Sequence, residues 1–162
     1  MSRKIIRAIA ILVTAALMLA GAGAEGTRPV QLPGSRYVID VPESMQYENP
    51  GEGAGDLAFV WILPGAEAGS ARMEIDFFTY ASAWADLGET ARAMAENGAE
   101  AELRSVNGVD LLCAESTDPT DGAPCISYAL LDGGRMIEIA FWYSDQETAD
   151  LSRTIMETLR TF

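Results

Sequence analysis

The chain has 162 residues, 49% of them hydrophobic, and a formal net charge of −13 at neutral pH. This length suits one compact domain, and the apolar content is ample for a core, which excludes a disordered protein. The chain contains no histidine, so histidine-based catalytic triads and the usual zinc sites are excluded. The excess of carboxylates repels nucleic acid, and we expect no nucleic acid partner.

Residues 1–24 have the pattern of a cleavable signal peptide. Basic residues within the first seven positions precede an apolar run at 8–20, and Ala22-Gly23-Ala24 has the small-residue form of a cleavage site. The run is shorter than the ~20 residues that a spanning helix needs. We therefore expect cleavage after Ala24 and a secreted or extracytoplasmic mature chain that is not inserted in a membrane. A lead-in segment at 25–35 and a single domain at 36–162 would follow.

Strands are predicted in the first half of the chain, at 30–32, 37–41, 57–63 and 72–80. Residues 57–63 are apolar at every position, which favours a central strand covered on both faces. Residues 72–80 alternate, so that Met73, Ile75 and Phe77 share one buried side. An acidic loop is expected at 48–56.

Two helices are indicated by capping signals. Asp86 and Glu89 have the spacing of a capping box, and Asn97-Gly98 would end that helix. Ser144 and Glu147 predict a second capping box, followed by apolar residues at helical spacing as far as residue 162.

The residues between the helices predict a meander of antiparallel strands. Pairing about the turn at 132–134 places Tyr128 and Ile139 on one face. If the preceding hairpin is centred near Pro119, Cys113 lies opposite Cys125 on the other face. In an exported chain such a pair predicts a disulfide, with two buried free thiols as the alternative.

Both faces of this meander are largely apolar. The economical arrangement is α+β, with a mostly antiparallel sheet and a helix packed on each face, an α/β/α sandwich.

Phe78, Tyr80 and Trp84 form a candidate binding patch. Phe78 and Tyr80 have the parity opposite to the buried Phe77, so their rings must lie under a helix or at the surface. The alternative is that Tyr80 and Trp84 seal the junction between sheet and helix.

Carboxylates are the remaining source of chemistry. Glu74, Asp76 and Glu138 lie within predicted strands and could serve a hydrolase of the glycosidase type. Acidic residues also gather at 48–56 (Glu48, Glu52, Asp56) and around 115–121 (Glu115, Asp118, Asp121), but neither loop has the EF-hand pattern. We assign no catalytic, cofactor-binding or metal-ligating residue, and calcium binding stays a weaker alternative.

The order of elements resembles the PsbP-like fold. This fold is an α/β/α sandwich that is found in extrinsic photosystem subunits and in small exported bacterial proteins. The resemblance is carried by the opening strand 37–42, YVIDVP, and by the closing strand and helix from Phe141 to Phe162. It implies binding and assembly rather than catalysis, and it transfers no functional residue.

We therefore expect a secreted, non-enzymatic binding or assembly domain that acts on an unidentified protein partner without a cofactor. A small-ligand or calcium-binding protein is the alternative, and a carboxylate-based hydrolase is the third hypothesis.

Overall fold

The computed structural model describes residues 26–51 and 53–162 of the chain. The predicted signal peptide lies outside the described residues. The described strands are β1 (Thr27–Gln31), β2 (Tyr37–Pro42), β3 (Gln46–Glu48), β4 (Leu57–Pro64), β5 (Ala71–Ala81), β6 (Ala101–Val106), β7 (Val109–Thr117), β8 (Pro124–Asp132), β9 (Arg135–Tyr143) and β10 (Arg160–Thr161). The described helices are α1 (Leu87–Glu96) and α2 (Gln146–Glu157).

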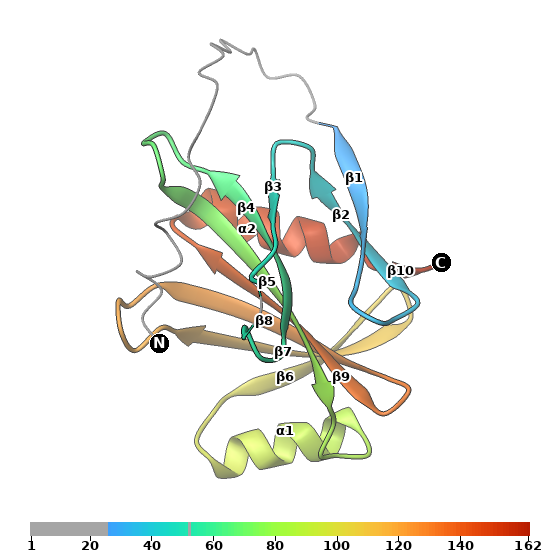
Figure 1. Cartoon of the computed structure of the whole chain (residues 1–162). Coiled ribbons are helices and arrows are strands. Elements are labelled where there is room, and N and C mark those ends of the chain that lie inside the picture. Colours follow the sequence, from blue (N-terminus) through green and yellow to red (C-terminus); the bar gives the residue numbers. More distant parts are fainter. Residues whose placement is uncertain (1–25, 52) are drawn as a thin grey trace.

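Seven of these strands form one antiparallel sheet in the order β3-β4-β5-β9-β8-β7-β6. Strands β1 and β10 flank β2 in a separate small sheet, also antiparallel. Strand β1 lies within the segment predicted as a lead-in. Helices α1 and α2 accompany the sheets (Figure 1), and the predicted α+β class with a mostly antiparallel sheet is confirmed.

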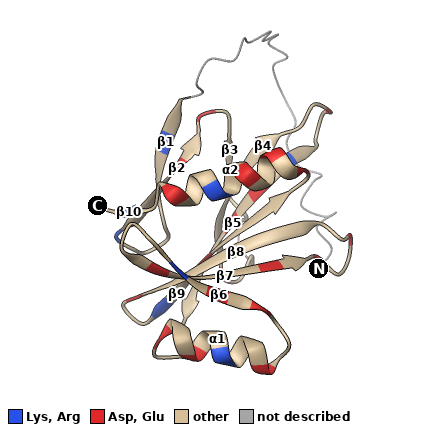
Figure 2. Cartoon of the chain, turned by 180° about the vertical axis from the view of Figure 1, so that it is seen from behind, with Lys and Arg blue, Asp and Glu red and all other residues tan. Residues whose placement is uncertain are grey.

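The main core lies on one face of the seven-stranded sheet, which we call the core face. Phe77, Ile139 and Phe141 point to this face and are completely buried. Helix α2 contacts β9 and β2, and it lies behind the sheet in Figure 1 and in front of it in Figure 2. The acidic and basic residues of α2 are spread along its length in Figure 2. Because α2 packs on the core face, the opposite face of the sheet, which we call the second face, points away from α2.

The predicted arrangement of one helix on each face of the sheet is not confirmed, because of the position of α1. Helix α1 makes its main contacts with β6 and β7, at one end of the sheet, and its single buried residue is Thr90. Its predicted N-cap is confirmed, because the Asp86 carboxylate accepts a hydrogen bond from the Glu89 amide at 2.8 Å. Within the described part of the chain, no helix is long and apolar enough to cross a membrane.

Helix α2 begins one residue later than the predicted cap. The cap is Asp145, whose carboxylate accepts from the Thr148 amide at 2.9 Å, while the Thr148 hydroxyl accepts from the Asp145 amide at 3.3 Å. The amide and the hydroxyl of Thr148 both donate to the Asp145 carboxylate, and these two hydrogen bonds lower the pKa of the Asp145 carboxyl. The box therefore uses Asp145 and Thr148 in place of Ser144 and Glu147.

The helix predicted from the spacing of apolar residues also extends too far at its C-terminal end. The helix ends at Glu157, because Arg160 and Thr161 pair with β2 as strand β10. Arg160 holds the Asp40 carboxylate with two hydrogen bonds of 2.9 and 2.8 Å. Phe162, which was expected to continue the apolar face of the helix, is 83% exposed.

The predicted disulfide is wrong, because the β7–β8 register differs from the one expected. The turn is Asp118 to Ala123, closed by hydrogen bonds between these two residues and from Gly122 to Asp118. Its centre lies beyond Pro119, so Cys113 pairs with Tyr128 and Cys125 pairs with Ser116. The shift of three residues is odd in number and places the two thiols on opposite faces of the sheet. Both cysteines are buried and no disulfide joins them.

The hairpin between β8 and β9 has the predicted register, with Tyr128 opposite Ile139. Strand β4 differs from the expectation of a central strand. It is second from the edge of the sheet, flanked by the three-residue β3, and Phe59 and Ile62 are only half-buried.

Candidate functional site

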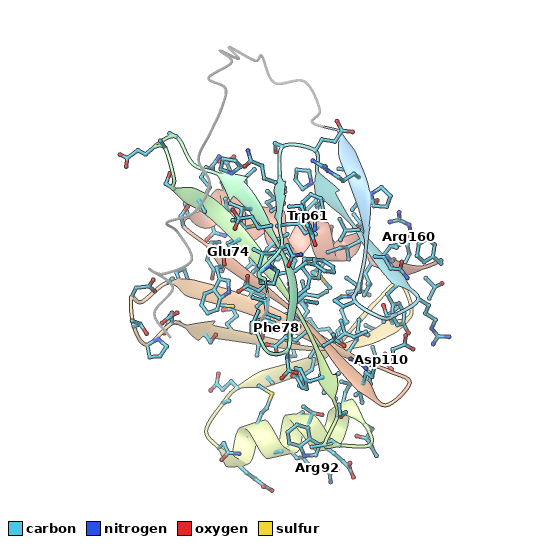
Figure 3. The ribbon with its side chains drawn as sticks, in the orientation of Figure 1. Trp61, Glu74, Phe78, Arg92, Asp110 and Arg160 are labelled. Atoms are coloured by element: carbon cyan, nitrogen blue, oxygen red, sulfur yellow. The ribbon has the colours of Figure 1, made fainter. Side chains whose placement is uncertain are left out.

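A shallow, open pocket of about 330 Å³ lies on the second face of the sheet. Phe78 and Tyr80 of β5 form one side, and Glu138 and Trp142 of the neighbouring β9 form the middle. Phe78 is labelled in Figure 3, which is drawn from the side opposite to α2. The alternation that buries Phe77 in the core sends Phe78 and Tyr80 to this face.

The far wall of the pocket comes from β7 and β8. Ser116, Cys125 and Ser127 line it, and Ala140 of β9 leaves room above the sheet. Cys125 is opposite Trp142 in the β8–β9 register and is only 2% exposed. Asp56 completes the rim from the residue before β4, where its carbonyl accepts a hydrogen bond from the Thr79 amide at 3.0 Å.

Glu138 and Tyr80 form a hydrogen-bonded pair inside the pocket. The Tyr80 hydroxyl donates to the Glu138 carboxylate at 3.2 Å. Burial raises the pKa of the Glu138 carboxyl above its ordinary value, and the hydrogen bond from Tyr80 opposes that rise. Burial and the nearby Glu138 charge raise the pKa of Tyr80 to about 12. Tyr80 is therefore protonated, and a donor, throughout the physiological pH range.

Trp142 is held in place by a second carboxylate. Its indole nitrogen donates to Asp76 at 2.9 Å, and Asp76 is only 5% exposed. Because the hydrogen bond fixes one edge of the ring, the indole presents a defined apolar surface to the pocket. The pocket therefore combines aromatic rings with carboxylates on neighbouring strands.

Two residues of the predicted binding patch reach this pocket, and the third does not. Trp84 lies in the loop between β5 and α1, where its amide donates to the Ser82 hydroxyl at 3.1 Å and its carbonyl accepts from that hydroxyl at 2.8 Å. Its side chain is 40% exposed and does not line the pocket. Sequence reasoning named Glu138 only as a strand carboxylate and did not connect Trp142 or Asp56 with Phe78. The parity of β9 was the available signal, since Glu138 and Trp142 alternate with buried residues.

The acidic residues around 118–121 form the turn between β7 and β8. The Asp118 carboxylate accepts from the Thr120 amide at 2.7 Å, and the Asp121 carboxylate accepts from the Ala123 amide at 3.0 Å. Glu52 lies outside the described residues. Among the residues that are described, no group of three or more acidic or cysteine side chains is arranged to hold a metal ion.

The described chain is an α+β protein with an antiparallel main sheet, a helix packed over its core face and a pocket on its second face. The fold is PsbP-like, and the predicted resemblance is confirmed. The solution structure of cyanobacterial PsbP (CyanoP) from Synechocystis sp. PCC 6803 matches with a TM-score of 0.61 at 11% identity, covering 90% of this chain and 98% of that chain.

A crystal structure from Bacteroides thetaiotaomicron VPI-5482 matches with a TM-score of 0.57 at 18% identity. It covers 85% of this chain, which spans about half (49%) of that protein. No protein-family model matches the sequence, and no match is found among curated proteins. At these identities the likeness concerns the fold alone.

Proposed function

We propose that this protein is an exported, non-enzymatic binding or assembly domain that docks a protein partner on the second face of its sheet. The observation that carries this proposal is the pocket itself, which presents Phe78, Tyr80 and Trp142 together on a face that points away from α2. Aromatic side chains are enriched at the energetic centres of protein interfaces, because they bury a large area at little cost in conformational entropy. The open shape of the pocket suits an inserted side chain better than an enclosed substrate.

The test compares partner capture by two serine variants, one at the half-buried Phe78 and one at the exposed Tyr47. Phe78→Ser removes one wall of the pocket, and Tyr47→Ser removes a ring that is 54% exposed on β3, outside the pocket. Protein purified after expression of the full chain is used as bait in an extract of the producing cell. We expect one partner to be recovered by the wild type and by Tyr47→Ser, and to be lost with Phe78→Ser. Retention of that partner by a folded Phe78→Ser variant would contradict the proposal.

Two features of the pocket favour a second candidate, a carboxylate-based hydrolase. Glu138 and Asp56 line the same pocket, and burial raises the pKa of Glu138, as a general acid requires. The chain has no histidine, so these carboxylates would have to supply both the acid and the base. Turnover of a panel of aryl glycosides that is abolished by Glu138→Gln would support this candidate over a binding domain.

Small-ligand binding is the other alternative, since the volume of the pocket lies at the lower end of the ~300–1,000 Å³ typical of ligand sites. A small ligand would raise the melting temperature of the isolated protein, whereas a protein partner leaves it unchanged until the partner is added. Calcium is tested in the same way.

A further inference from the structure

The pocket on the second face combines the two kinds of group that recognise organic cations. Aromatic faces attract a cation through the ring quadrupole, and carboxylates attract it by charge and hydrogen bonding. Phe78 and Trp142 supply the rings, and Glu138 and Asp56 supply the carboxylates. Among the described residues, no arginine lines this pocket.

Elsewhere the same chain shows how a guanidinium fits such surroundings. The Arg28 guanidinium stacks over the Trp61 ring, 4.9 Å from its centre, and donates a hydrogen bond of 2.9 Å to the Met45 carbonyl. Arg36 stacks in a similar way over Tyr37, at 5.4 Å. A planar guanidinium can therefore lie on a ring and still use its edge for hydrogen bonds.

Glu138 is the carboxylate best placed to receive such an edge. The hydrogen bond it accepts comes from the neutral Tyr80, and no arginine of the described residues forms an ion pair with it. Burial raises its pKa, which shows that its negative charge is poorly solvated. An incoming cation would compensate that charge.

We propose that this pocket receives an arginine side chain of the protein partner, with the guanidinium stacked on the aromatic rings and hydrogen-bonded to Glu138 and Asp56. This inference rests on the proposed function and names the chemistry that the partner must present. The acidic balance of the chain, 24 Asp and Glu against 11 Lys and Arg, would also steer a basic segment toward the protein.

The experiment uses peptides that differ only in the charge of one side chain. Isotopically labelled protein, purified after expression of the full chain, is titrated with acetyl-Gly-Arg-Gly-amide and with the same peptide containing citrulline, which has nearly the shape of arginine but no charge. The three tryptophan indole signals are followed by NMR. We expect the arginine peptide to shift the signal of Trp142 and to leave those of Trp61 and Trp84 in place. The citrulline peptide should bind at least about tenfold more weakly.

Matched variants separate the pocket from the general acidic surface. Glu138→Gln and Asp56→Asn keep the shape of the pocket and should each weaken the arginine peptide by roughly threefold or more. Glu147→Gln removes the same charge from α2, where the side chain is paired with Arg72 on the surface, and should leave binding unchanged. A melting curve for each variant shows whether it is folded.

Several results would overturn the inference. They are equal binding of the citrulline and arginine peptides, equal weakening by Glu147→Gln and Glu138→Gln, and the absence of any shift of the Trp142 signal. A lysine peptide that binds as well as the arginine peptide would overturn the assignment to a guanidinium.

The proposed function can fail or survive separately from this inference. Partner capture that depends on Phe78, combined with equal binding of citrulline and arginine, would leave the docking surface standing and remove the arginine. Equal partner capture by the wild type and by Phe78→Ser would contradict the proposed docking surface, even if the arginine peptide still binds.

Discussion

The hydroxyl of Tyr80 on β5 donates a hydrogen bond of 3.2 Å to the carboxylate of Glu138 on β9, across 58 positions of sequence. The two strands are neighbours in the seven-stranded sheet, and Glu138 lies directly opposite Phe78 in their register. The pair therefore joins the predicted binding patch to a carboxylate that the sequence did not connect with it.

Replacing Tyr80 by phenylalanine is expected to destabilise the protein by about 1 kcal/mol at neutral pH, because the Glu138 carboxylate loses its hydrogen-bond donor. Urea denaturation of both proteins measures this difference. Tyr47→Phe is the matched control, since Tyr47 is 54% exposed and lies outside the pocket. Equal loss of stability in the two variants would show that the Tyr80 hydroxyl makes no special contribution.

Glu138→Gln is expected to gain stability relative to the wild type as the pH rises. The pKa of Glu138 is above its ordinary value of 4.5, so the folded state holds this proton more tightly than the unfolded chain does. Ionisation of Glu138 therefore lowers the free energy of unfolding of the wild type as the pH rises from 4.5 through the folded pKa. Glutamine cannot ionise and still accepts a hydrogen bond from Tyr80, which stays protonated with a pKa of about 12.

The measurement for Glu138→Gln is urea denaturation of both proteins at about pH 4 and about pH 7. The difference in free energy of unfolding should move in favour of the variant at the higher pH. A difference that stays constant, or moves the other way, would contradict the burial of an uncompensated carboxylate at this position.

Asp145→Ala is expected to lower the free energy of unfolding, because the N-terminal end of α2 loses its cap. Ser144→Ala is the control, since Ser144 is the residue that the sequence pattern favours as the cap. The hydroxyl of Ser144 donates only to the neighbouring Asp145, at 3.3 Å. A larger effect at Ser144 than at Asp145 would restore the cap predicted from the sequence.

Both thiols are expected to be free and protected in the native protein. Cys113 is 6% exposed and Cys125 is 2% exposed, and no disulfide joins them. A thiol reagent should react slowly before denaturation and should then label both cysteines, as counted by mass spectrometry. A mass that shows no labelling after denaturation without reductant would point to a disulfide.

The extent to which sequence predicts this fold depends on how local each signal is. The Asp132-Gly133-Gly134 turn fixes the register of its own hairpin, so Tyr128 opposite Ile139 could be derived. The longer turn at 118–123 has no such dipeptide at its centre, and a displacement of its centre by one or two residues shifted every pair along β7 and β8. The predicted helix ran past Glu157 because the pairing of β10 with β2 is a tertiary interaction, which the spacing of apolar residues does not encode.

The pocket could be predicted only in part for the same reason. Parity alone brings Phe78 and Tyr80 to one face of β5. Their meeting with Glu138 and Trp142 depends on which strands are neighbours, and β5 and β9 are separated by a helix and three strands in the sequence. Trp84 stands in a loop, where alternation carries no information about direction.

Because Cys113 and Cys125 lie on opposite faces of the sheet, a disulfide between them is incompatible with the native pairing of β7 and β8. A bond between the two sulfurs would require β7 to slide along β8 and to turn its core residues outward. An oxidised molecule would thus be locked in a misfolded hairpin rather than reinforced. In an oxidising compartment, correct folding of this protein would then require β7 and β8 to pair faster than the two thiols are oxidised to a disulfide.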